Sequence, residues 1–178
     1  MDTKLIEAYF ELRKEIDAAS ERLEKQHKNQ MACKKGCSMC CESLRLFPLE
    51  LAAISRELGE TMQSLPGKKF RLNPKACRFL VNDACTIYAS RPIICRTQGL
   101  ALLYENKQGT GFEFSTCRLN FKEVAIESFN QDNALFMSPF NSRLFLLNQQ
   151  FVKQLNKTKV TAFSRYKLNN LGSLSELE

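Results

Sequence analysis

The sequence lacks several features that mark common enzyme classes. Its 178 residues include a single histidine, His27, and one imidazole is a poor supply for general acid–base catalysis at neutral pH. We find no Ser–His–Asp set, no phosphate-binding loop and no dinucleotide fingerprint. These absences disfavour triad hydrolases and nucleotide-binding enzymes, and they leave open whether the protein catalyses a reaction.

Long apolar runs are also missing. No run approaches the roughly 18 residues that a membrane-spanning helix requires. The N-terminal residues alternate between apolar and charged, whereas a secretory signal has an uninterrupted apolar core. We therefore expect a cytoplasmic protein without a membrane partner, in a compartment where thiols stay reduced.

Cysteine, in contrast, is abundant and clustered. Four of the eight cysteines fall between residues 33 and 41, and Gly36 supplies a tight turn with positive φ beside Cys37. Closely spaced thiols in a reducing compartment are typical of metal sites. An even number of cysteines would also permit a disulfide framework, but the adjacent Cys40 and Cys41 suit a simple disulfide poorly. The candidate metal ligands are Cys33, Cys37, Cys40, Cys41, Cys77, Cys85, Cys95 and Cys117.

The spacings do not choose the metal. Zinc and a [4Fe–4S] cluster each take four thiolates, so eight cysteines supply two such sites or one cluster with four spare thiols. We expect Cys40 and Cys41 to point in different directions, which favours two sites. Eight thiolates and two zinc ions would lower the net charge from +7 to +3. Nearby cations should lower the thiol pKa values. The remaining basic residues are scattered, so a nucleic-acid partner is not expected.

Two long amphipathic helices are predicted near the ends of the chain. The first covers residues 3–29, and its stripe either packs inside the chain or forms a dimer seam. His27, six residues before Cys33, is expected to be exposed at its end, with a metal ligand as the alternative. The second covers residues 141–168 and should pack on the first. The first stripe is Leu5, Tyr9, Leu12, Ile16, Ala19 and Leu23; the second is Leu144, Leu147, Phe151, Leu155 and Phe163.

Shorter elements are predicted between these helices. A helix should begin at Pro48, end at Gly59 and cover the metal site with its apolar face. A loop over 60–76, a turn at Asn82-Asp83 and a short helix after Pro92 that carries Cys95 should follow. The final predictions are a β-hairpin with strands 100–104 and 112–115, a helix over 119–130 and a frayed tail from residue 172.

The fold class that follows is mainly α with a small β-hairpin. We expect one domain, residues 1–178, in which a cysteine-rich metal-binding core over 33–117 is flanked by helical segments over 1–32 and 118–178.

One motif resembles a known family. Cys33-x3-Cys37-x2-Cys40-Cys41, followed by Cys85-Thr86-Ile87-Tyr88-x2-Arg91-Pro92-x2-Cys95-Arg96, resembles the YkgJ-type cysteine-cluster family, which is described as zinc- or iron-chelating. The cluster is also similar to one in a flagellin lysine methylase. The resemblance implies that all eight cysteines are ligands. It also implies that Arg91 and Arg96 lie by the cofactor and offset thiolate charge, while Tyr88 packs on the site or is an ordinary core tyrosine.

We therefore expect a protein that holds zinc or an iron–sulfur cluster and has a structural, electron-carrying or sensing role. The alternative is an enzyme, or enzyme component, that uses an iron–sulfur cluster in protein modification. The first three cysteines also match the radical SAM spacing, but 178 residues is short for that barrel and five further cysteines have no place in it. The expected partners are an unidentified protein or a second copy bound through residues 3–29.

Overall fold

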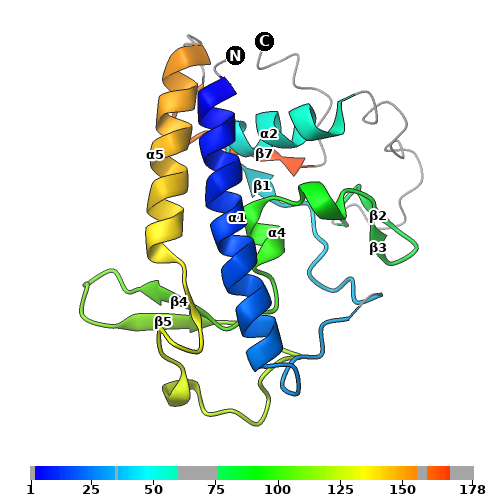
Figure 1. Cartoon of the computed structure of the whole chain (residues 1–178), viewed down its shortest axis with the longest axis vertical. Helices are drawn as coiled ribbons and strands as arrows, with labels where there is room; N and C mark the ends of the chain where they lie inside the picture. Colours follow the sequence, from blue (N-terminus) through cyan, green and yellow to red (C-terminus); the bar gives the residue numbers. More distant parts are fainter. Residues whose placement is uncertain (1–2, 35, 60–75, 156–159, 169–178) are drawn as a thin grey trace. The chain divides into compact units, whose positions relative to one another are not determined.

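The computed structural model describes residues 3–34, 36–59, 76–155 and 160–168 (Figure 1). The chain forms two compact units. Unit 1 comprises residues 1–10, 35–92 and 145–178, and unit 2 comprises residues 11–34 and 93–144. The predicted tail and, except for Ala76, the predicted loop over 60–76 lie outside the described residues.

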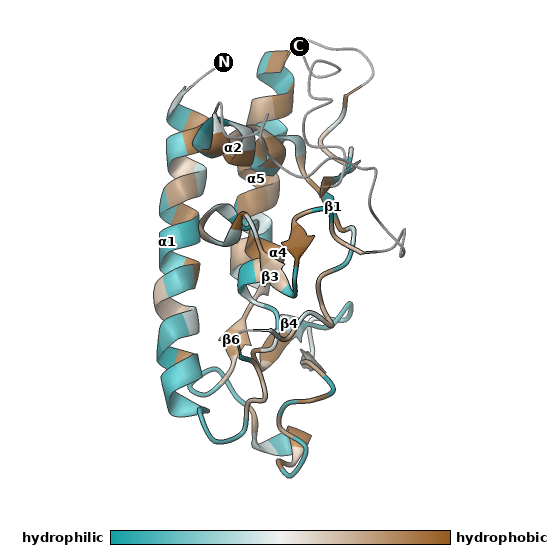
Figure 2. Ribbon diagram, turned by 90° about the vertical axis from the view of Figure 1, so that its right-hand side faces the viewer, coloured by the Kyte–Doolittle hydropathy of each residue, from teal (hydrophilic) through white to brown (hydrophobic). Residues whose placement is uncertain are grey.

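Helix α1 (Thr3–Gln26) carries the predicted apolar stripe. Leu5, Tyr9, Leu12, Ile16 and Leu23 are buried within the single chain, whereas Ala19 is half-buried. Figure 2 shows the polar remainder of this helix in teal. The helix ends three residues before the predicted boundary because the chain enters a turn, in which the Gln30 N–H donates to the His27 carbonyl at 2.8 Å.

Helix α5 (Ser138–Leu155) begins and ends earlier than predicted. Leu144 and Phe151 are buried as expected, but Phe163 lies beyond the helix and is 77% exposed. The prediction of a helix through residue 168 is wrong, because strand β7 (Tyr166–Lys167) pairs antiparallel with β1 (Arg45–Leu46). This pairing joins residues 120 and 122 positions apart, which local periodicity does not reveal.

Unit 1 contains the predicted short helix and the predicted turn. Helix α2 (Pro48–Leu58) starts at proline and is followed by Gly59 at φ +46°. Figure 2 shows it in brown, as a largely hydrophobic helix. Strands β2 (Leu80–Val81) and β3 (Ala84–Cys85) form a hairpin whose two turn residues have positive φ, 48° at Asn82 and 57° at Asp83. Asparagine and aspartate tolerate that conformation best among residues with a side chain. The 3₁₀ helix η2 (Tyr88–Ser90) follows.

Unit 2 is built on a three-stranded sheet in the order β5-β4-β6. Strands β4 (Leu102–Glu105) and β5 (Phe112–Ser115) form the predicted hairpin, and β6 (Leu135–Phe136) runs parallel to β4. Helix α4 (Ile93–Arg96) follows Pro92 and carries Cys95, as predicted. The buried residues that pack together around the sheet are Ala101, Leu103, Phe121, Phe129 and Ala134.

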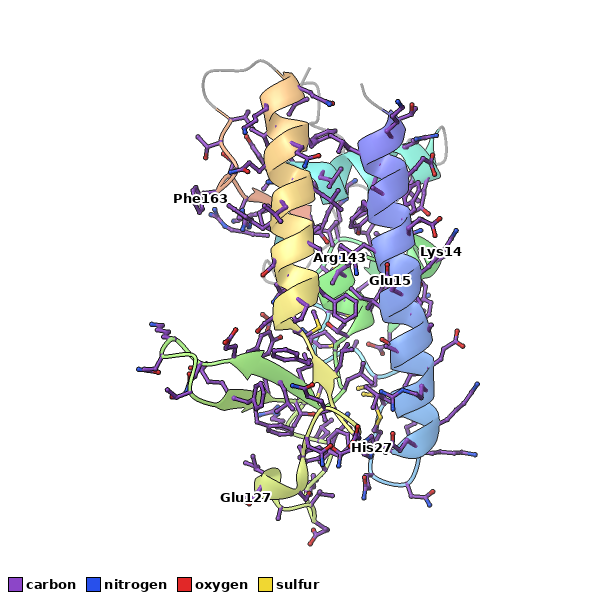
Figure 3. The ribbon with its side chains drawn as sticks, turned by 60° about the vertical axis from the view of Figure 1, so that its left-hand side comes forward. Lys14, Glu15, His27, Glu127, Arg143 and Phe163 are labelled. Carbon is purple, nitrogen blue, oxygen red and sulfur yellow. The ribbon has the colours of Figure 1, made fainter. Side chains whose placement is uncertain are left out.

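The predicted helix over 119–130 is wrong. This segment forms turns and a three-residue 3₁₀ helix, η3 (Ile126–Ser128). Phe121 has φ +55°, a conformation that an α-helix cannot contain. Its N–H donates instead to the Gln30 carbonyl at 2.8 Å. The ion pair of Glu15 on α1 with Arg143 on α5, visible in Figure 3, also lies in unit 2. Among the described residues no helix is both long and apolar enough to cross a membrane.

Candidate metal centre

In unit 1 three cysteine thiols lie around a fourth, Cys41. The pKa of the Cys41 thiol is raised to about 11, first by burial and then by the negative charges that Cys40, Cys77 and Cys85 carry when ionised. A side-chain hydrogen bond with Cys40 raises the pKa of Cys41 further. Coulombic effects of this kind fall with distance, so all three residues lie near Cys41. We call Cys40, Cys41, Cys77 and Cys85 the unit 1 thiol group.

Backbone hydrogen bonds bring these distant cysteines together. The Cys77 N–H donates to the Cys41 carbonyl at 2.9 Å, and Glu42 and Ala76 form an antiparallel bridge beside it. The Cys41 N–H closes a turn on Ser38 at 2.9 Å. Cys85 comes from β3, whose partner strand begins three residues after Cys77. The group is therefore set by main-chain pairing between two segments about 36 residues apart in the sequence.

The group lies against the apolar core of unit 1. Cys77 is 8% exposed and belongs to that core, while Cys41 and Cys85 are half-buried and pack against it. Helix α2 contributes Leu51 and Ile54 to the same cluster, as expected for a helix that covers the cysteines. The buried members of this core are Leu46, Leu51, Ile54, Cys77, Phe79, Ile87 and Leu168. Cys40 is exposed, so one side of the group faces solvent.

Two expectations do not hold at Cys41. Cys40 and Cys41 were expected to point apart, but a side-chain hydrogen bond links them. Nearby cations were expected to lower thiol pKa values, but the pKa of Cys41 rises because burial and the charges of neighbouring sulfurs dominate there. Gly36, next to Cys37, does adopt the predicted positive φ, at 93°.

Unit 2 holds Cys33, Cys95 and Cys117, and a buried asparagine contacts one of them. The Asn120 side-chain N–H lies 3.3 Å from the Cys33 sulfur and donates a hydrogen bond to it. Gly99 adjoins the same sulfur, since a Cβ atom at that position would lie 2.5 Å from it. Neither residue was predicted from the sequence. The spacing Cys117-x2-Asn120 could have pointed to Asn120 in the sequence. It corresponds to a turn in which the Asn120 backbone N–H donates to the Cys117 carbonyl at 2.9 Å.

The two predicted cofactor-binding arginines contact protein groups. The Arg96 side chain is 8% exposed and donates to both carboxylate oxygens of Asp17 at 2.7 Å. Arg91 stacks over the Tyr88 ring, 3.5 Å from its centroid, and donates to the Tyr88 carbonyl. Tyr88 is 63% exposed, so the interpretation of it as a core residue is wrong. A role for Arg91 and Arg96 beside a cofactor stays a prediction.

His27 is buried rather than exposed, contrary to prediction. Its Nδ1 lies 2.8 Å from Gln30 Oε1, and its Nε2 lies 2.6 Å from the Asn133 carbonyl oxygen. The ring meets Phe121 edge-on, with centroids 5.1 Å apart. Figure 3 shows His27 just after the end of α1. With both nitrogens hydrogen-bonded inside unit 2, this histidine is not available as a metal ligand.

The donor chemistry suits a soft metal. All eight cysteines are present as thiols, and four thiolates are the complete donor set of a structural zinc site or a [4Fe–4S] cluster. Among the described residues, no three His, Cys, Asp or Glu side chains are already arranged to hold a metal ion. By donor type the residues of the unit 1 thiol group fit such a cofactor, and their side chains would have to turn inward to bind it.

Comparison with known proteins identifies one family. The family model named CxxCxxCC, described as "Putative zinc- or iron-chelating domain", matches residues 32–129. That range contains all eight cysteines, together with Asn120 and Gly99. No curated protein and no solved structure matches the chain. Since the match covers more than half of the sequence, and the structure places three of its thiols around Cys41, the protein belongs to the CxxCxxCC family.

Proposed function

We propose that this protein binds zinc or an iron–sulfur cluster through cysteine thiolates, and that the unit 1 thiol group forms one four-thiolate site. The observation that supports the proposal is the position of Cys41, which has three other cysteines within the range of its electrostatic field. Four thiols in one place serve no packing need that apolar side chains would not meet better. They do form the donor set that a soft metal prefers.

The residues of unit 1 have separate tasks in such a site. Cys40, Cys41, Cys77 and Cys85 hold the cofactor, and Leu51 and Ile54 of α2 keep water from its buried side. Because the pKa of Cys41 is about 11 without metal, this thiol holds its proton at neutral pH and releases it on metal binding. Bound zinc would stabilise the fold, and a bound iron–sulfur cluster would supply a redox centre for electron transfer or sensing.

The test is the metal and acid-labile sulfide content of protein purified without air, together with its visible spectrum. Iron and sulfide with absorption near ~400 nm would indicate a cluster, and zinc in a colourless protein would indicate a structural site. Cys85→Ser should lose the metal of the unit 1 thiol group. Thr86→Ser should keep it, because serine retains the hydroxyl that donates to the Phe79 carbonyl at 3.1 Å. Protein that contains neither metal, and takes up neither on reconstitution, would contradict the proposal.

A further inference from the structure

The side chain of Asn120 joins three segments of unit 2. It is 3% exposed. Its Oδ1 accepts the Ala32 N–H at 2.8 Å, and its Nδ2 donates to the Gly99 carbonyl at 2.6 Å and to the Cys33 sulfur at 3.3 Å. Both amide donor hydrogens and the acceptor are therefore used. The three segments are those that contain or follow cysteines 33, 95 and 117.

The contact with the Cys33 sulfur has a second, independent support. Gly99 has φ +94°, which glycine adopts without strain. Its missing side chain leaves room for the sulfur, since a Cβ atom would approach to 2.5 Å. Cys33 is otherwise an exposed residue. The Cys33 sulfur thus has a hydrogen-bond donor, from Asn120, and a space beside it that the missing side chain of Gly99 leaves open. Packing alone would not fix the position of this exposed residue.

We propose that Asn120 is the positioning residue for Cys33 as a metal ligand, an inference that rests on the proposed function. A neutral thiol is a weak hydrogen-bond acceptor, whereas a metal-bound thiolate carries negative charge and accepts strongly. The Asn120 N–H therefore stabilises the ligated form of Cys33 and orients its sulfur. Groups that orient metal ligands in this way commonly change metal affinity about 10- to 100-fold.

The test uses the full chain loaded with zinc alone. Iodoacetamide is added, and peptide mass spectrometry follows alkylation of each cysteine. Asn120→Asp keeps the acceptor for Ala32 but replaces the donor with a negative charge. We expect Cys33 to be alkylated at least about 10-fold faster in this variant, with Cys77 as protected as in the wild type. Circular dichroism checks that the variant is folded.

The matched control is Asn148→Asp. Asn148 is fully buried in unit 1, where it accepts from the Leu49 N–H at 3.2 Å and donates to the Ala162 carbonyl at 3.0 Å, with no sulfur contact. This variant should leave the protection of Cys33 unchanged. Unchanged protection of Cys33 in Asn120→Asp would overturn the inference, and so would equal loss of protection at Cys33 and Cys77, which would show a general structural role.

Wild-type protein provides a measurement that needs no variant. On addition of zinc, the NMR signals of the Asn120 side-chain amide should shift, while those of Asn148 stay in place. Unmoved Asn120 signals would overturn the inference even if Asn120→Asp failed to fold. The proposed function fails separately: it is contradicted if neither zinc nor a reconstituted iron–sulfur cluster protects Cys41, Cys77 and Cys85. If those three cysteines are protected and Cys33 is not, only the proposed role of Asn120 is contradicted.

Discussion

Replacing Cys77 with alanine separates its contribution to packing from its contribution through metal binding. Cys77 packs with Phe79 and Ile87 in the unit 1 core. In metal-free protein the substitution should cost about 1 kcal/mol, because it removes one buried atom about the size of a methylene group. With metal at about 100 times its Kd, the wild type gains about 2.7 kcal/mol, or about 5–11 °C in Tm for a chain of this length.

The variant should lose most of that gain. Loss of a group that only orients a ligand weakens metal binding by up to about 100-fold, and loss of a thiolate ligand should weaken it at least as much. The same metal concentration then adds at most about 0.4 kcal/mol, or about 1–2 °C. The assay is thermal unfolding of both proteins, with and without metal at the same free concentration. The difference between the two metal-induced shifts isolates the ligand role.

The matched control is Ile54→Val, a buried residue of the same core. Loss of one methylene should cost about 0.5–1.5 kcal/mol equally with and without metal. If metal raises the Tm of Cys77→Ala as much as that of the wild type, Cys77 is not a ligand and the assignment of the unit 1 thiol group is wrong.

Three further predictions concern single contacts. Glu15→Gln should lower the free energy of unfolding by about 0.2–1 kcal/mol at neutral pH. Because Arg143 lowers the pKa of Glu15, thermal unfolding should show that this difference disappears as the pH falls below the usual carboxyl pKa. Since the pKa of Cys41 is raised to about 11, metal-free wild type should lose stability relative to Cys41→Ala as pH rises from about 9 towards 11; parallel stability curves would contradict this. Asn82→Ala should cost about 1 kcal/mol in urea unfolding, because its φ is +48°, and Asn82→Gly should not; equal losses would refute the turn argument.

Several elements were predictable because their signals are local. The apolar stripe of α1, the proline and glycine that bound α2, and the paired turn residues Asn82 and Asp83 each express a preference of a few neighbouring residues. The helix predicted over 119–130 was wrong because a local signal was overridden by long-range contacts. Its periodicity was adequate, but Phe121 gains more from burial and from its bond to Gln30 than from a helical conformation.

The candidate site divides in a similar way. The cysteine motif by itself determined the family and the soft-donor chemistry, because spacing and residue type are properties of the chain. Tertiary structure alone decided which thiols surround Cys41, because their position depends on the hydrogen bond from the Cys77 backbone N–H to the Cys41 carbonyl. It also decided that Asn120 meets Cys33, 87 residues away. Such contacts arise from the burial of apolar surface and the pairing of buried polar groups over long separations, and no local pattern in the sequence records them.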